Sequence, residues 1–352
     1  MLNRRTFVAT ALTAAALSRQ THAAEPLKVG FVYVGPVGDH GWTYAHDQGR
    51  LMVEAEFGEQ VQTTFVESVS EGPDAERVIR RLAQEGHALI FTTSFGYMNS
   101  TLKVAERLPE VKFEHATGYK TADNMAAYNS RFYEGRAVCG TIAGYMSKAG
   151  VGGYIASFPI PEVVMGINAF QLAAQKINPD FETRVVWVNT WYDPAKEADA
   201  AKALIDQGAD IITQHTDSPA ALQAAEARGL LAFGQAWDMS SFAPNAHLTA
   251  IKDDWGPYYI DRVRAVLDGT WQTQSTWWGM KEGAVQMTPY ANMPGDVAKI
   301  AQAMEAGIID GSIHPFEGPV SDQSGTVRIA AGERPSDETL LTMDWYVAGA
   351  KA

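Results

Sequence analysis

The sequence of 352 residues has little cysteine and no long hydrophobic run after its N-terminal segment. Its single cysteine, Cys139, has no partner for a disulfide. It falls in an apolar stretch, 134–147, where we expect a helix that packs the thiol as a small hydrophobic group. No segment beyond the N-terminus approaches the roughly 18–20 apolar residues that a membrane helix needs, so we expect a soluble chain.

Motifs of catalysis, metal binding and phosphate binding are also missing. His40 and His46 form no His-x-x-x-His pattern, and Ser94 and Ser157 lack a Gly-x-Ser-x-Gly setting. The glycine-rich loop at 35–42 has neither Gly-Lys-Ser/Thr nor Gly-x-Gly-x-x-Gly. No spacing among the 41 acidic residues singles out an acid/base pair. We therefore expect a protein without cofactor or metal that is not an enzyme, with a periplasmic nucleoside hydrolase as the catalytic alternative.

Positive charge is scarce. The sequence has 28 Lys and Arg residues against 41 Asp and Glu residues, which gives a formal net charge of −13. Such a protein repels phosphate backbones and anionic lipid. The balance therefore excludes nucleic acid and membrane surfaces as expected partners.

The N-terminus has the form of a cleavable export signal over residues 1–24. Arg4 and Arg5 precede an uncharged Ala/Leu-rich stretch at 6–18, and small residues surround Ala23. The paired arginines leave both the twin-arginine and the ordinary secretory route open. Cys139 lies far from the processing site, so we expect a periplasmic protein without a lipid anchor. Cleavage leaves 328 residues (352 minus 24), a length that favours two domains.

After Pro26 the chain alternates short β-rich runs with helical stretches, which predicts mostly parallel sheets with helical crossovers. In the first half we expect strands at 28–34, 62–66, 88–93 and 112–116 and helices at 43–57, 74–85 and 98–107. In the second half we expect strands at 153–157, 184–189, 210–215 and 230–234 and helices at 162–177, 195–206 and 219–227.

A weak internal repeat relates the two halves. A helix begins at Pro73 and ends near Gly86, and another begins at Pro194 and ends near Gly208. Each is followed by a buried strand with polar residues at its end, at 92–94 and 215–217. Similar βα units also arise without duplication, but the shared polar ends favour two equivalent lobes.

Ligands of parallel sheets bind outside the carboxyl ends of the strands, so we expect a cleft between the lobes. Trp42 follows the first strand, and Trp191 follows a strand in the second half. Two aromatic side chains at equivalent edges predict a sandwich for a flat ring, although a single Trp more often seals a core. The candidates for reading the edge of that ring are polar residues after strand ends, namely Asn189, Asp217, Asp238 and Lys252, each of which equally fits a solvated loop or a helix cap.

From residue 28 to residue 325 the chain resembles the basic membrane protein (BMP, PnrA-like) family of substrate-binding proteins for ABC importers. The segments that carry the resemblance are Gly-Asp-His-Gly-Trp-Thr at 38–43, Asn-Ser-Arg-Phe-Tyr-Glu-Gly at 129–135, Phe-Pro-Ile-Pro-Glu-Val at 158–163, Gly-Ile-Asn-Ala-Phe at 166–170, Trp-Tyr-Asp-Pro-Ala-Lys-Glu at 191–197 and His-Pro-Phe-Glu-Gly-Pro at 314–319.

The resemblance implies the fold of a class I periplasmic binding protein, an ABC permease as partner, and a purine nucleoside or base as ligand. It implies stacking roles for Trp42 and Trp191 and places Asp238 where relatives grip ribose hydroxyls, with Lys252 near a lysine of that site. The chain departs from the family pattern in three ways: it lacks a lipid-bearing cysteine, Trp replaces Phe at both stacking positions, and Met165 stands where relatives carry Arg. Bulky Trp side chains leave less room, which favours a free base such as adenine or hypoxanthine over a nucleoside.

We therefore predict two Rossmann-like α/β lobes joined by crossing strands, lobe 1 at 26–129 plus 250–283 and lobe 2 at 130–249 plus 284–352. The expected protein is a monomer that closes on its ligand and presents the closed form to a permease. A ligand sensor for a membrane receptor is the non-catalytic alternative. Phe95 and Tyr133 complete the set of predicted ligand-binding residues.

Overall fold

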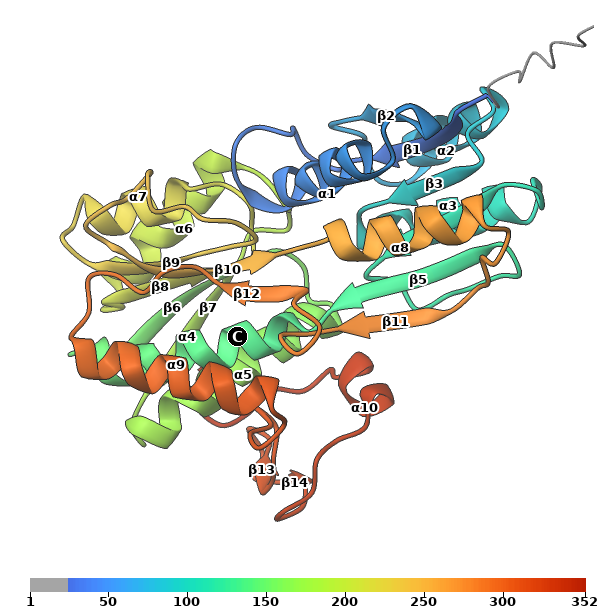
Figure 1. Cartoon of the computed structure of the whole chain (residues 1–352). Coiled ribbons are helices and arrows are strands. Elements are labelled where there is room, and N and C mark those ends of the chain that lie inside the picture. Colours follow the sequence, from blue (N-terminus) through green and yellow to red (C-terminus); the bar gives the residue numbers. More distant parts are fainter. Residues whose placement is uncertain (1–24) are drawn as a thin grey trace, which may run out of the picture.

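Two β-sheets with helices on both faces organise the chain in the computed structural model, which describes residues 25–352 (Figure 1). The predicted export signal, 1–24, lies outside the described residues. No helix within residues 25–352 is both long enough and apolar enough to cross a membrane.

The smaller sheet is parallel throughout and has the strand order β11-β5-β4-β3-β1-β2. Helices α1 and α8 pack on one of its faces, and α2 and α3 pack on the other. The bounds of these elements are β1 Leu27–Val32, α1 Gly41–Phe57, β2 Val61–Val66, α2 Pro73–Gln84, β3 Leu89–Thr92, α3 Met98–Ala105, β4 Lys112–Ala116, β5 Met125–Ser130, α8 Gly256–Leu267 and β11 Ser275–Trp278.

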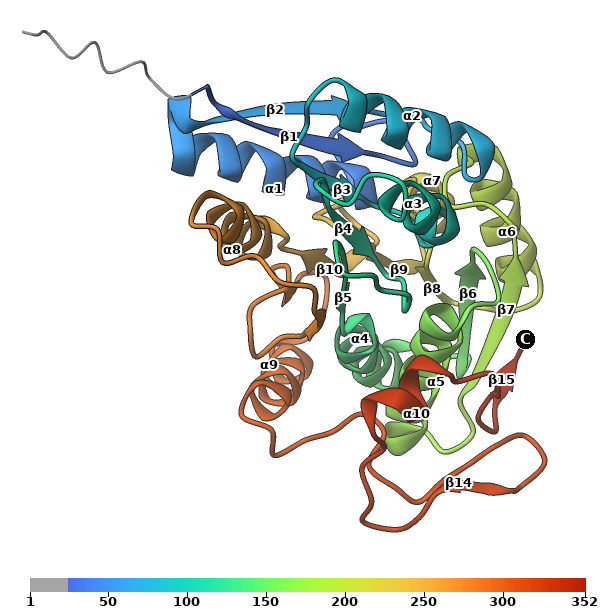
Figure 2. The same ribbon diagram turned by 90° about the vertical axis from the view of Figure 1, so that its right-hand side faces the viewer.

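The larger sheet has the order β12-β10-β9-β8-β6-β7-β15, and only the pairing of β12 with β10 is antiparallel. Helices α4, α5 and α9 cover one face, and α6 and α7 cover the other (Figure 2). The bounds are α4 Phe132–Met146, β6 Val151–Ala156, α5 Pro161–Ile177, β7 Glu182–Trp187, α6 Pro194–Asp206, β8 Ile211–Gln214, α7 Ala220–Glu226, β9 Leu231–Gly234, β10 His247–Asp253, β12 Val285–Met287, α9 Gly295–Ile309, α10 Asp337–Leu341 and β15 Ala350–Lys351, with a hairpin of β13 Val320–Ser321 and β14 Val327–Ile329 beside them.

The predicted α/β fold with two parallel-sheet lobes is confirmed. Every strand and helix named in the two predicted halves is present with ends shifted by a few residues. The central strands are buried on both faces because helices cover both, and alternate side chains enter opposite cores. Phe31 packs beneath α1 and α8, for example, whereas Val32 packs beneath α2.

The two repeated units have the same local structure. Pro73 and Pro194 each occupy the first turn of a helix, where a missing N–H costs nothing. Gly86 and Gly208 follow these helices with φ of 88° and 100°, a conformation that glycine adopts without strain. Each unit thus ends its helix in the same way and turns into a buried strand, β3 or β8.

The chain passes between the two sheets after β5, after β10 and after β11. The predicted segment boundary at Ala250 falls inside β10, which belongs to the larger sheet as far as Asp253. The division into two lobes that move about these crossings stays a prediction. We refer to the smaller sheet with its helices as lobe 1 and to the larger sheet with its helices as lobe 2.

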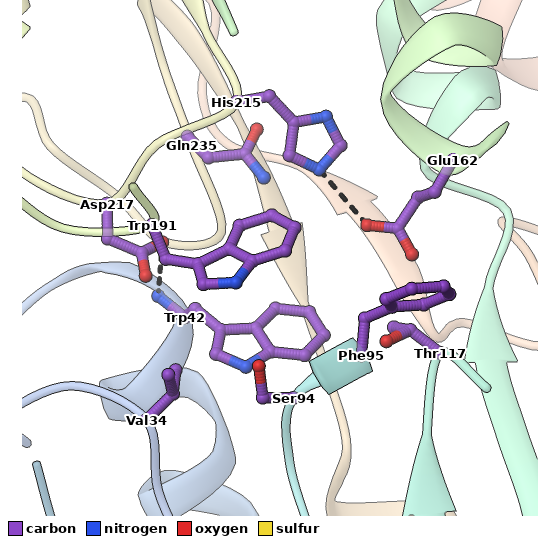
Figure 3. A pocket seen from close by; sticks show the side chains of 10 residues that line it. All are labelled: Val34, Trp42, Ser94, Phe95, Thr117, Glu162, Trp191, His215, Asp217 and Gln235. Carbon is purple, nitrogen blue, oxygen red and sulfur yellow. Dashed lines mark hydrogen bonds and ion pairs between the residues drawn. The ribbon is translucent and has the colours of Figure 1, made fainter. Parts of the chain in front are cut away.

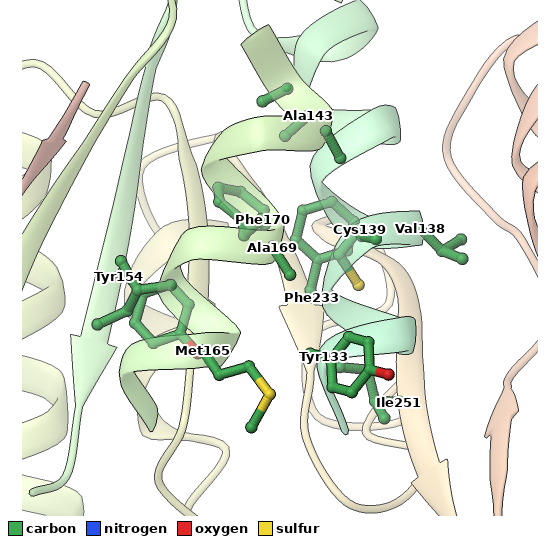
Figure 4. Packing of buried hydrophobic residues seen from close by; sticks show 14 of the residues in the cluster. Tyr133, Val138, Cys139, Ala143, Tyr154, Met165, Ala169, Phe170, Phe233 and Ile251 are labelled. Atoms are coloured by element: carbon green, nitrogen blue, oxygen red, sulfur yellow. The ribbon is translucent and has the colours of Figure 1, made fainter. Parts of the chain in front are cut away.

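The core of lobe 2 is centred on the crossing of α4 and α5 (Figure 4). Cys139 is fully buried there beside aliphatic and aromatic side chains, as predicted. Met165 is buried in the same cluster. Small residues bring the two helices close, because a Cβ on Gly140 would lie 2.2 Å from the carbonyl oxygen of Phe170. This packing fixes the start of α5, which reaches the pocket described next.

Candidate ligand-binding site

A pocket of about 380 Å³ lies between the lobes, where the carboxyl ends of strands from both sheets face each other (Figure 3). Each lining residue follows a strand or begins a helix directly after one. This is the place where ligands bind in open parallel sheets. The ten lining residues are Val34, Trp42, Ser94, Phe95 and Thr117 from lobe 1 and Glu162, Trp191, His215, Asp217 and Gln235 from lobe 2.

Two indole rings from opposite lobes form the broad walls of the pocket. Trp42, at the start of α1, is fixed by a bond of 2.6 Å from its Nε1 to the carbonyl oxygen of Thr93 and by packing against Trp255. Trp191, after β7, packs against Phe158, and its Nε1 donates to Glu71 Oε1 at 3.1 Å. Both rings are therefore held in place by contacts with the rest of the protein.

Three polar side chains of lobe 2, Glu162, His215 and Gln235, line one side of the pocket and are called the polar wall below. His215 Nε2 donates to Glu162 Oε1 at 3.2 Å, and Glu162 Oε2 is buried without a partner among the described residues. Gln235 Oε1 accepts a hydrogen bond from the guanidinium of Arg136. Arg136 is itself fully buried and also donates to Thr213 Oγ1 at 3.1 Å. Each polar side chain of the wall is held by a hydrogen bond to another side chain, which fixes its orientation.

Burial changes the protonation of groups around the pocket. Desolvation lowers the pKa of His215 and outweighs the effect of Glu162, so the ring is neutral near pH 7. Desolvation, reinforced by the charge of Glu197, raises the pKa of Asp217 to about 8. Asp253 lies fully buried behind the pocket, and desolvation raises its pKa well above the ordinary value. Both of its oxygens lack a hydrogen-bond partner among the described residues.

Contacts across the pocket hold the lobes together. The backbone N–H of Trp42 in lobe 1 donates to Asp217 Oδ1 in lobe 2 at 3.1 Å. The bond from Trp191 to Glu71 runs from lobe 2 to lobe 1. Tyr44 meets Trp237 edge to face with ring centroids 5.1 Å apart. In this structure the two lobes are thus in direct contact beside the pocket.

Strained backbone positions mark the pocket edge. Thr117, Asn189 and Ala236 have positive φ of 62°, 53° and 62°, although none is a glycine. Each follows the end of a strand, β4, β7 or β9, and turns the chain away from the sheet at the cleft. Such turns decide which side chain after a strand faces the ligand.

Four predicted site residues, Trp42, Phe95, Trp191 and Asp217, line this pocket together. Asn189 lines a neighbouring, more open cavity of about 760 Å³ that shares Val34 and Trp191 with the first.

The structure does not bring the other three predicted residues to the pocket. Asp238 instead accepts a hydrogen bond from Ser240 N at 2.8 Å and so closes a local turn. Lys252 lies over the ring of Trp237, 4.7 Å from its centroid. Tyr133 is buried in α4 and packs against Phe316.

Sequence reasoning missed Glu162, Gln235, Thr117 and Val34 as lining residues. Glu162 belongs to the Phe-Pro-Ile-Pro-Glu segment. Its position in the first turn of α5, after β6, is the signal that could have identified it. Gln235 directly follows β9, three residues before the predicted Asp238. The turn at Ala236 lies between them and explains why Gln235, not Asp238, reaches the ligand side.

The fold and the pocket together define a two-lobed α/β binding protein with a site between its lobes. Comparison with known families gives the same result from the sequence: the chain belongs to the Bmp family of PnrA-like ABC transporter substrate-binding proteins, which it matches over residues 27–323. Membership implies a small-molecule ligand and an ABC permease as partner.

Two curated relatives cover most of the chain. A purine-binding protein of Brucella abortus (strain 2308) is 63% identical over 333 residues, 95% of each chain. A putative ABC transporter glucose-binding protein of Haloferax volcanii is 36% identical over 327 residues, 92% of this chain and 80% of its own. A solved solute-binding protein of an ABC transporter system from Aeropyrum pernix K1 superposes with a TM-score of 0.72 at 20% identity, over 82% of this chain and 93% of its own, and supports the fold.

Proposed function

We propose that this protein binds a purine base between Trp42 and Trp191 and delivers it to the permease of an ABC importer. The observation that carries the proposal is the pair of indoles, one from each lobe, on the two sides of one pocket. A purine ring stacked on aromatic faces gains about 1–3 kcal/mol per contact. The name of the Brucella relative, with its 63% identity, supports a purine over the sugar named for the more distant Haloferax relative.

The pocket favours a free base such as adenine or hypoxanthine over a nucleoside. Asp238 and Lys252, the residues expected to hold ribose hydroxyls, lie outside the pocket. The contacts of Trp42 with Asp217 and of Trp191 with Glu71 also hold the two lobes together beside the pocket. A ribose in this space would lack the partners that its hydroxyls need.

Export, the periplasmic location and the monomeric state belong to the same proposal. The signal at 1–24 supports export by either the secretory or the twin-arginine route.

A binding role requires no bond of the ligand to be broken. Incubation with adenosine or guanosine followed by chromatography tests this point, since free base released at turnover rates would indicate a hydrolase.

Calorimetric titration with adenine, hypoxanthine, adenosine and glucose tests the proposal. We expect a purine base to bind most tightly and expect Trp42→Ala and Trp191→Ala each to weaken its binding by about tenfold or more. Trp345→Ala is the matched control, because Trp345 is half-buried in the core of lobe 2 away from the pocket. The proposal fails if no purine binds, or if both pocket variants bind as tightly as the control.

A further inference from the structure

The polar wall contains a carboxylate oxygen that is left without a hydrogen-bond donor beside the stacking site. Glu162 Oε1 is bonded to His215, while Glu162 Oε2 is buried with no partner among the described residues. In Figure 3 this second oxygen points toward Phe95, across the pocket. A buried acceptor without a donor costs free energy, so a ligand that supplies an N–H at this point gains affinity.

The same wall leaves one N–H donor unused. The donors of Trp42, Ser94, Thr117 and Trp191 are bonded to Thr93 O, Glu71, Ala116 O and Glu71, and His215 donates to Glu162. Among the side-chain N–H groups of the ten lining residues this leaves the amide nitrogen of Gln235, whose oxygen is already held by Arg136. Figure 3 shows that nitrogen directed toward the ring of Trp191.

Arg136 fixes which end of the Gln235 amide faces the ligand. A guanidinium only donates, so it must bond to the amide oxygen and turn the NH₂ group the other way. Because Arg136 is fully buried and is also bonded to Thr213 Oγ1 and the carbonyl oxygen of Gln214, it cannot turn aside. His215 likewise fixes Glu162. Glu162 and Gln235 therefore present an acceptor and a donor in a fixed order.

We propose that Glu162 and Gln235 read the edge of the stacked ring as a donor and acceptor pair, with Arg136 and His215 as positioning residues. This inference rests on the proposed function. The ligand class is a free heterocyclic base that presents an N–H group to Glu162 Oε2 and a carbonyl oxygen or ring nitrogen to Gln235 Nε2. Hypoxanthine and adenine both carry such neighbouring groups, whereas a flat ring without an N–H does not. Stacking on the two indoles supplies affinity, and this edge supplies selectivity.

The test uses single substitutions that exchange one atom of the wall. Glu162→Gln keeps an oxygen for His215 and turns an NH₂ group toward the ligand, so donor would meet donor. Gln235→Glu keeps an oxygen for Arg136 and presents a second oxygen to the ligand, so acceptor would meet acceptor. We expect each variant to bind hypoxanthine and adenine about tenfold or more weakly, because a buried polar group is left unpaired. Melting temperatures without ligand verify that each variant folds.

Quinoxaline is the matched ligand, since it is a flat two-ring heterocycle with ring nitrogens but no N–H. We expect it to bind the wild-type protein at least about tenfold more weakly than hypoxanthine and to lose no affinity in Glu162→Gln, whose NH₂ group can donate to a ring nitrogen. Equal binding of quinoxaline and hypoxanthine to the wild type overturns the inference. So does an equal loss for both ligands in Glu162→Gln, or no loss for the bases in either folded variant. If no purine binds the wild type at all, the proposed function itself fails.

Discussion

At the scale of single residues, Asp217 joins the two lobes through a carboxyl group whose pKa is raised. Burial and the neighbouring charge of Glu197 raise its pKa to about 8, from an ordinary value near 3.8. The folded protein therefore binds a proton more tightly at this site than the unfolded chain does. The stability that this proton provides is fully present below the unfolded pKa and is lost as the pH rises toward and through about 8.

Asp217→Asn should remove this pH dependence. The amide keeps an oxygen that accepts from the backbone N–H of Trp42, but it has no proton to lose. We expect the melting temperature of the variant, relative to the wild type, to rise steadily between pH 5 and pH 8.5. Thermal denaturation without ligand in a series of buffers measures this difference. A difference that stays constant across the series would contradict the assigned environment of Asp217.

The side chains of the pocket divide into those that a sequence predicts and those that it does not. Trp42 and Trp191 were predictable because each lies where a strand of a parallel sheet leads into the following helix, which is where ligands bind, and because the two positions correspond in the two halves. Gln235 was not predictable, because the positive φ of Ala236 decides which side chain turns toward the ligand. Lys252 lies outside the pocket because its cation lies over Trp237, a contact that no local sequence pattern indicates.

At the scale of elements, the approach of α4 to α5 depends on Gly140. A Cβ at this position would lie 2.2 Å from the carbonyl oxygen of Phe170, which is backbone and cannot move aside. We expect Gly140→Ala to lower the free energy of unfolding by about 1–3 kcal/mol through overpacking, measured by urea denaturation.

The matched control for this prediction is Gly295→Ala. Gly295 begins α9, and a Cβ added there meets no atom within 4 Å. Alanine also reduces the entropy of the unfolded chain, so this variant should be neutral or slightly more stable. Equal destabilisation in the two variants would show that close helix packing is not the cause.

Most elements of the fold could be predicted because local patterns fix them. Pro73 and Pro194 begin helices and Gly86 and Gly208 end them by conformational preferences that act within a few residues. Strand β15, Ala350–Lys351, is different, since it exists through pairing with β7 more than 160 positions earlier. No local pattern encodes such a pairing, so the outer strands and the order of both sheets had to come from the structure.

At the scale of the whole molecule, the two lobes are joined by contacts that also hold the indole rings of the pocket. The bond from Trp191 Nε1 to Glu71 Oε1 crosses from lobe 2 to lobe 1, and Glu71 in turn holds Ser94 Oγ at 2.6 Å. One carboxyl group thus connects the wall of lobe 2 to the strand ends of lobe 1. In the proposed function, a ligand stacked on Trp191 would stabilise the arrangement of the lobes that contains this bond.

Trp191→Phe should therefore speed the release of ligand. Phenylalanine keeps an aromatic face but lacks the N–H that reaches Glu71, so this arrangement of the lobes loses one bond. We expect the dissociation rate constant of a bound purine to rise by about tenfold, measured by stopped-flow fluorescence. Trp42→Phe is the control, because the N–H that it removes bonds to Thr93 within lobe 1. An equal acceleration in both variants would contradict a role for the contact between lobes.

The central claim, a purine base held between Trp42 and Trp191, is tested most directly by a crystal structure of the protein with hypoxanthine. The account predicts electron density for one flat ring between the two indoles, in the pocket of about 380 Å³, with its edge toward Glu162 and Gln235. Density for the base at any other place, or a ring that stacks on neither indole, would contradict it.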